Sequence, residues 1–115
     1  MPTALIIEDE ALIALDLQTE LQGLGFDVVG VARTGAEAVA LLRNGAPDIA
    51  IVDLMLNGDA SGARLAETLS ARGVRVLIVS GGDARQAAES GHAFLPKPWT
   101  RDDLNREIGA LTALA

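Results

Sequence analysis

The sequence has no cysteine and no tyrosine, and it contains a single histidine, His92. Without cysteine the chain has no disulfides and no cysteine-based phosphoryl chemistry, and one histidine does not make a histidine-rich metal site. If the chain binds a metal ion, oxygen atoms must therefore supply the ligands.

Positive charge is also scarce, since the formal net charge is -7 and the sequence pI is about 4.5. Nucleic-acid binding needs a basic surface, so we expect no direct contact with DNA or RNA. No apolar stretch approaches the ~18 residues that span a bilayer, and residues 1–20 lack the basic start and the cleavage pattern of a signal peptide. We therefore expect no membrane insertion and a cytoplasmic location.

The length and composition predict one compact domain over residues 1–115, because 50% of the 115 residues are hydrophobic. Short apolar runs alternate with helical stretches, which is typical of repeated βα units around a parallel sheet. The apolar runs lie at 4–7, 28–31, 49–52, 74–79 and 93–95. The pattern predicts an α/β fold with five strands and five helices.

Four helices can be placed from apolar spacing and end signals, over residues 10–24, 35–44, 61–72 and from 101 to the C-terminus. Thr100 and Asp103 resemble a capping box for the last of these helices. In the first helix, the predicted buried stripe consists of Ile13, Leu17, Leu21 and Leu24. Leu12 and Leu15 fall outside that stripe.

Acidic residues stand where two apolar runs end. Glu8 and Asp9 follow the first run, Asp53 follows the third, and Lys97-Pro98 comes after the last. The carboxyl ends of parallel strands open into the crevice where α/β sheets bind ligands, so these carboxylates are expected to converge. Converging carboxylates repel one another unless a cation or a proton joins them. The sequence therefore predicts a site for a hard divalent metal such as Mg²⁺.

Together with Ser80-Gly81 after the fourth run and Phe94 in the fifth, these residues resemble the receiver domain of two-component response regulators. The resemblance covers essentially the whole chain, with the motifs in the expected order. It implies a flavodoxin-like, doubly wound parallel sheet of order 2-1-3-4-5, with helices on both faces and the site at the switch point between the first and third strands.

The resemblance also implies a role for each residue. Asp53 is the nucleophile that takes a phosphoryl group from a phosphohistidine. Asp9, Asp53 and the backbone carbonyl of Met55 bind Mg²⁺, and Glu8 binds it directly or through water. The ammonium group of Lys97 neutralises a phosphoryl oxygen, and Pro98 follows a cis bond.

Three further residues complete the implied site and its switch. The Ser80 hydroxyl and the Gly81 backbone N–H contact the phosphoryl group, and Phe94 swings inward when Ser80 moves toward it. For any one of these positions taken alone, a structural role is an alternative explanation. Asp53 could cap a helix, and Lys97 could be a surface lysine. Phe94 and the side chain of Met55 could simply belong to the hydrophobic core.

The sequence departs from the family pattern in two places. The loop from Leu54 to Gly62 lacks the proline usual four positions after the aspartate, and it is one residue longer before its glycine. Only sixteen residues separate Ser80 from Lys97, which predicts a shortened fourth helix. Since that helix belongs to the usual signalling surface, the family's output geometry does not transfer directly.

We interpret the chain as a stand-alone, phosphoryl-accepting switch in a histidine-to-aspartate phosphorelay. It is a regulator rather than a metabolic enzyme, with a sensor histidine kinase or a histidine phosphotransferase as donor and an unknown protein as downstream target. Leu12 and Leu15 either form the apolar patch where a kinase helix docks or are covered by neighbouring helices.

Two other functions are possible from the sequence. The first is an interaction module that keeps the receiver fold and works without phosphorylation. The second is an aspartate-nucleophile phosphatase, which requires another Asp two residues after the nucleophile. Since that position is Met55, the sequence favours the receiver.

Overall fold

The computed structural model describes residues 1–56, 61–81 and 91–112 of the chain. Five parallel strands form one sheet of order β2-β1-β3-β4-β5, which confirms the predicted order. The strands are β1 (Thr3–Ile7), β2 (Asp27–Ala32), β3 (Ile49–Asp53), β4 (Arg75–Ser80) and β5 (Ala93–Pro96). The helices are α1 (Ala11–Gly23), α2 (Gly35–Leu41) with a short 3-10 turn (Leu42–Asn44), α3 (Ser61–Ala71) and α5 (Arg101–Thr112).

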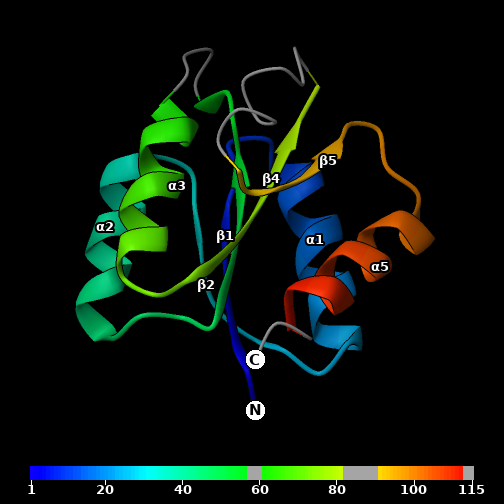
Figure 1. Ribbon diagram of the computed structural model, residues 1–115, viewed down its shortest axis with the longest axis horizontal. Helices are drawn as coiled ribbons and strands as arrows, with labels where there is room; N and C mark the ends of the chain where they lie inside the picture. Colours follow the sequence, from blue (N-terminus) through cyan, green and yellow to red (C-terminus); the bar gives the residue numbers. More distant parts are fainter. Residues whose placement is uncertain (57–60, 82–90, 113–115) are drawn as a thin grey trace.

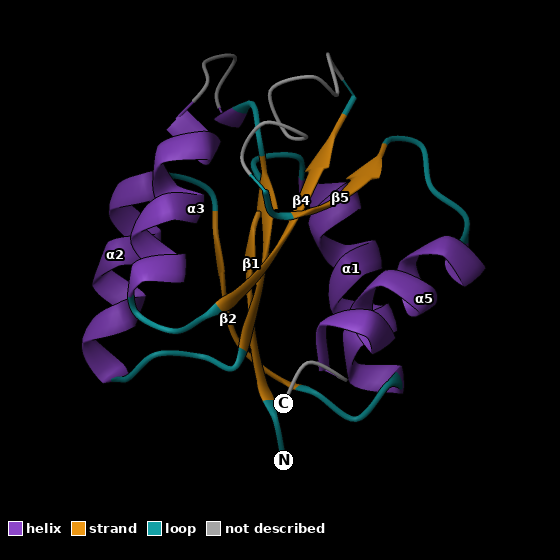
Figure 2. Ribbon diagram, viewed as in Figure 1, coloured by secondary structure: helices purple, strands orange, loops and turns teal. Residues whose placement is uncertain are grey.

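The helices cover both faces of the sheet. Figures 1 and 2 show α2 and α3 against one face and α1 and α5 against the other. A strand buried on both faces must be apolar at every position, and all five residues of β3 are buried. Along this strand, Ala50 and Val52 pack in the core on the α2 and α3 side, whereas Ile49 and Ile51 pack on the α1 and α5 side.

The predicted stripe of α1 is correct at its centre and wrong at its end. Leu17 and Leu21 are fully buried, and Ile13 is partly buried against the same core. Leu24, however, is 42% exposed, because the helix ends at Gly23 and Leu24 lies in the turn that follows. Ala14 takes a buried position instead.

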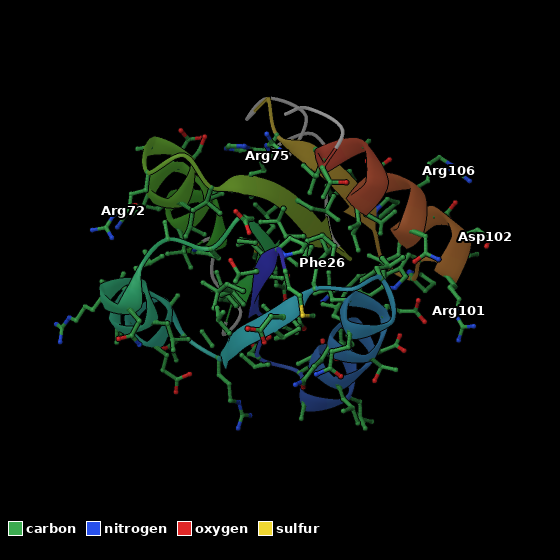
Figure 3. All side chains as sticks on the ribbon, turned by 90° about the horizontal axis from the view of Figure 1, so that it is seen from below. Phe26, Arg72, Arg75, Arg101, Asp102 and Arg106 are labelled. Carbon is green, nitrogen blue, oxygen red and sulfur yellow. The ribbon has the colours of Figure 1, made fainter. Side chains whose placement is uncertain are left out.

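Both ends of α5 are held by hydrogen bonds. The predicted capping box is confirmed, since the Asp103 N–H donates to the Thr100 hydroxyl oxygen at 3.1 Å and the Thr100 N–H donates to the Asp103 carboxylate at 3.5 Å. At the other end, the Arg75 guanidinium donates to the carbonyl oxygens of Leu111 and Thr112 at 3.2 and 3.4 Å. Figure 3, seen from below, shows Arg75 at the start of β4, beside the end of α5. These bonds satisfy helix-terminal carbonyls and tie α5 to the sheet.

Two sequence predictions concern segments outside the described residues. The shortened fourth helix falls on residues 82–90, and the altered loop after Asp53 includes residues 57–60. Within the described part of the chain, no helix has both the length and the apolar character needed to span a bilayer.

Candidate functional site

The predicted site residues come together at the carboxyl edge of the sheet, which is the upper edge in Figure 1. Asp53 ends β3 and Ser80 ends β4. Glu8 and Asp9 directly follow β1, and Lys97 directly follows β5. Because β1 pairs with β3, and β3 with β4, the carboxylates and the Ser80 hydroxyl start from neighbouring strand ends.

Lys97 bridges the buried carboxylates of the site. Its ammonium Nζ lies 3.2 and 3.3 Å from the two carboxylate oxygens of Glu8 and 3.3 Å from Oδ2 of Asp53. Glu8 is 1% exposed and Asp53 is 4% exposed. Lys97 is therefore an internal ion-pair partner rather than a surface lysine. The Lys97-Pro98 peptide bond is cis, as predicted.

Both carboxylate oxygens of Asp53 are held. Oδ1 accepts a hydrogen bond from the Met55 backbone N–H at 3.2 Å, and Oδ2 accepts one from Lys97. The backbone of Asp53 is confined as well, because a Cβ placed on Gly62 would overlap its carbonyl oxygen. The carboxylate thus has a defined orientation at the end of β3.

The site carries more negative than positive charge. Burial and the neighbouring Asp53 raise the pKa of Glu8 to about 7, although Lys97 acts in the opposite direction. Burial lowers the pKa of Lys97, but the carboxylates of Asp53 and Glu8 outweigh this effect and raise it above its ordinary value. One ammonium group therefore does not fully compensate the carboxylates, and a further cation would be favoured.

The three carboxylates fit a magnesium ion. Glu8, Asp9 and Asp53 each offer an oxygen, and these oxygens all lie within 4.8 Å of one another. Mg²⁺ binds oxygen ligands at about 2.1 Å in octahedral geometry, so its ligand oxygens lie roughly 3 to 4 Å apart. A small contraction of the acidic cluster would give this spacing. Hard carboxylate oxygens are also the ligand type that Mg²⁺ prefers.

The remaining predicted residues surround this acidic cluster or lie behind it. The Ser80 side chain is buried, and Gly81 lies beside Lys97, since a Cβ on Gly81 would be 3.8 Å from that of Lys97. Phe94 is partly buried against the core on the α2 and α3 side. The Met55 side chain is 41% exposed, so the alternative that it belongs to the core is wrong.

Ser80 and Phe94 lie on the same face of the sheet. Ile78 is paired with Phe94 across β4 and β5, and Ile78 belongs to the core on the α2 and α3 side. Side chains two residues apart on a strand share a face, so Ser80 points to the same side as Ile78. The two side chains that the resemblance implies to move together therefore face the same side of the sheet.

Sequence reasoning missed Arg33, which follows β2. Its guanidinium Nη2 donates to the backbone carbonyl oxygen of Asp9 at 3.4 Å. The two residues are 24 positions apart, and an exposed arginine after a strand has no distinguishing pattern. Only the pairing of β1 with β2 brings them together.

Comparisons with known proteins agree with this geometry. The response regulator receiver domain model matches residues 4–109. The transcriptional regulatory protein PdtaR of Mycobacterium tuberculosis is 33% identical over 105 aligned residues, and the alignment covers 87% of this chain and 51% of PdtaR. The phyllosphere-induced regulator PhyR of Methylorubrum extorquens is 48% identical over 59 aligned residues, and the alignment covers 50% of this chain and 22% of PhyR. The chain thus spans about half the length of PdtaR and less than a quarter of the length of PhyR.

A solved structure covers nearly the same length as this chain. The signal receiver domain of a modulated diguanylate cyclase from Desulfovibrio desulfuricans G20 is 34% identical, with a TM-score of 0.84 over 96% of this chain and 93% of that one. The family model covers most of the chain, and the strand order and acidic cluster match what the resemblance implied. The chain therefore belongs to the response regulator receiver domains of two-component signalling.

Proposed function

We propose that the chain is a phosphoryl-accepting switch, that residues 1–115 act as one receiver unit, and that Asp53 is the phosphorylated residue. The observation that carries this proposal is the meeting of Glu8, Asp9 and Asp53 within 4.8 Å, with Lys97 Nζ in contact with two of them. Such an arrangement suits a site that must accept a dianionic phosphoryl group next to a carboxylate nucleophile.

The proposed reaction is a phosphoryl transfer from a phosphohistidine to Asp53. A carboxylate oxygen of Asp53 forms a bond to phosphorus, the bond between phosphorus and the imidazole nitrogen breaks, and the imidazole keeps that electron pair. Water later hydrolyses the resulting acyl phosphate and restores the carboxylate. The fixed orientation of Asp53, held by the Met55 N–H and Lys97, supports this role.

Glu8, Asp9, Asp53 and the backbone carbonyl of Met55 would hold Mg²⁺. When bound, the ion supplies positive charge that offsets the carboxylates and the phosphoryl oxygens. Lys97 would turn from the carboxylates toward a phosphoryl oxygen, and the Ser80 hydroxyl and Gly81 N–H would donate hydrogen bonds to the same group. Movement of Ser80 would leave room for Phe94 to move inward.

The partner that supplies the phosphoryl group would dock beside α1. Leu12 is 83% exposed and Leu15 is 59% exposed, so no described neighbouring helix covers them. Large exposed apolar side chains next to a site indicate a protein contact. We infer that a helix of a histidine kinase or a histidine phosphotransferase contacts this surface in the cytoplasm. The downstream target would be another protein.

Phosphorylation with a small donor tests the proposal directly. The full chain is incubated with acetyl phosphate and Mg²⁺, and its intact mass is measured. We expect the mass of one phosphoryl group to be added to the wild type and none to Asp53→Asn or to a sample in EDTA. An unmodified wild type would favour a phosphorylation-independent interaction module, and a modified Asp53→Asn would place the nucleophile elsewhere.

A further inference from the structure

Arg33 connects two loops that meet at the acidic cluster. Its side chain reaches the backbone of Asp9, with 3.4 Å between Nη2 and the carbonyl oxygen. Its backbone N–H donates to the Glu37 carboxylate at 2.6 Å. Arg33 also lines, together with Glu8, a surface cavity of about 300 Å³ between α1 and β2. The guanidinium therefore lies at the rim of the proposed metal site.

The backbone that carries Arg33 is well fixed. Thr34 caps α2, since its hydroxyl oxygen accepts from the Glu37 N–H at 3.1 Å, and Glu37 reaches back to the Arg33 N–H. Just before this turn, the Glu8 N–H donates to the Ala32 carbonyl oxygen at 2.9 Å, which joins the ends of β1 and β2. Arg33 thus extends from an anchored turn toward Asp9.

The loop that carries Asp9 leads directly into α1, which begins at Ala11. Glu10 occupies the N-cap position of α1 but makes no side-chain cap hydrogen bond. A long bond of 3.4 Å from the Glu10 N–H to the Glu8 carboxylate provides a local restraint. Metal ligands depend on neighbouring hydrogen bonds for their orientation, and the loss of such a bond weakens metal affinity. The hydrogen bond from Arg33 to the Asp9 carbonyl oxygen is a neighbouring hydrogen bond of this kind.

We propose that Arg33 is a positioning residue for the metal site, which holds the backbone of Asp9 so that its carboxylate faces those of Glu8 and Asp53. This inference rests on the proposed function, since it assumes that the acidic cluster binds Mg²⁺. The positioning role of Arg33 can be distinguished by experiment from a simple effect of its charge. A positive guanidinium near the site repels a divalent cation, so removal of its charge alone would strengthen Mg²⁺ binding. Loss of a contact that positions Asp9 would instead weaken Mg²⁺ binding.

The test compares Mg²⁺ dissociation constants of the full chain and its variants. Trp99 is the single tryptophan and lines a cavity with Lys97 and Pro98, so its fluorescence reports on the site. The rise of melting temperature with Mg²⁺ concentration gives a second, independent measurement. Arg43→Gln is the matched control, because Arg43 is an exposed arginine in the 3-10 turn after α2 and its substitution changes the net charge equally.

For Arg33→Gln we expect the dissociation constant for Mg²⁺ to rise about 10-fold, with the melting temperature in EDTA close to that of the wild type. Arg43→Gln should bind like the wild type, and Arg33→Lys should recover little, because a shorter point charge does not reproduce the planar guanidinium. If the wild type binds Mg²⁺ and Arg33→Gln binds it equally well or more tightly, the positioning role of Arg33 is wrong. The proposed function would not be affected by that result. A wild type that does not bind Mg²⁺ would overturn the proposed function and this inference with it.

Discussion

The backbone N–H of Lys97 donates a hydrogen bond to the carbonyl oxygen of Ser80 at 2.8 Å. This bond continues the pairing of β4 with β5 by one step, beyond the Ser80 and Pro96 pair. Ser80 and Lys97, which are both proposed to contact the phosphoryl group, are therefore joined through their backbones. A displacement of the Ser80 backbone would be transmitted to Lys97, and through β5 to Phe94.

Removal of one carboxylate should stabilise the metal-free protein. We expect Asp53→Asn to raise the melting temperature in EDTA, because Glu8, Asp9 and Asp53 outnumber the single ammonium group of Lys97. Repulsion between charges at this range is worth on the order of 1 kcal/mol or more. Mg²⁺ should raise the melting temperature of the wild type more than that of the variant.

Thermal unfolding with EDTA and with ~10 mM Mg²⁺ measures both effects. Asp27→Asn serves as the control, since Asp27 is an exposed carboxylate at the start of β2, at the opposite end of the strands from the site. Its substitution should leave the response to Mg²⁺ unchanged. A wild type that is indifferent to Mg²⁺ would count against a carboxylate metal site.

Loss of the Lys97 ammonium group should destabilise the metal-free protein. In Lys97→Met the hydrogen bonds to Glu8 and Asp53 disappear, and bonds of this charged kind contribute about 1.5–3 kcal/mol each at most. Protonation of Glu8, whose pKa is already about 7, offsets part of this loss. We expect a net destabilisation of ~1–2 kcal/mol in EDTA, measured by urea unfolding, and most of it should be restored by Mg²⁺. An unaltered stability in EDTA would contradict the ion-pair geometry.

The sequence was a good guide to the sheet and to the strand ends. Apolar runs such as 49–52 are short and continuous, and such runs are typical of strands covered on both faces. The position of the charges directly after these runs then predicted which side chains meet. The meeting of Glu8, Asp53 and Lys97 confirms that part of the reasoning.

Other features depend on contacts that no sequence pattern encodes. Leu24 continues the apolar spacing of α1, but the helix ends one residue earlier and leaves it exposed. The contact of Arg33 with Asp9 depends on which strands are neighbours. The closeness of Gly62 to the Asp53 carbonyl depends on how the first turn of α3 packs against the end of β3. Each of these three features can be predicted only once the arrangement of the strands and helices in space is known.

The metal-free protein should become less stable as the pH rises from about 4.5 to about 7. These limits are the ordinary pKa of Glu8 and the value in the folded protein, which burial and Asp53 raise. Between them the folded state holds a proton that the unfolded state releases, so the free energy of unfolding falls with increasing pH. Glu8 contributes no further change above this range.

Urea unfolding in EDTA at a series of pH values measures this slope, and Glu8→Gln is the control that lacks the titrating group. We expect the wild type to lose more stability than Glu8→Gln across the range. Protons and Mg²⁺ compete for Glu8, so the affinity of the wild type for Mg²⁺ should also increase with pH over the same interval. Parallel pH profiles for the two proteins would show that Glu8 keeps its ordinary pKa.

Two glycines in helices should respond to alanine in opposite directions. A Cβ on Gly62, in the first turn of α3, would overlap the carbonyl oxygen of Asp53 and lie 2.6 Å from that of Leu54. Backbone atoms cannot move aside as a flexible side chain can, so Gly62→Ala must displace the end of β3. A Cβ on Gly109, in α5, would have no neighbour within 4 Å. Alanine there only improves helix propensity.

We therefore expect Gly62→Ala to lower the free energy of unfolding by ~1–3 kcal/mol, and Gly109→Ala to raise it by about 0.5–1 kcal/mol. Because the displaced backbone carries Asp53, Gly62→Ala should also weaken Mg²⁺ binding, whereas Gly109→Ala should not. Urea unfolding and Mg²⁺ titration of the two variants measure these effects side by side. If Gly62→Ala were as stable as the wild type and bound Mg²⁺ equally well, the close packing of α3 against the end of β3 would be wrong.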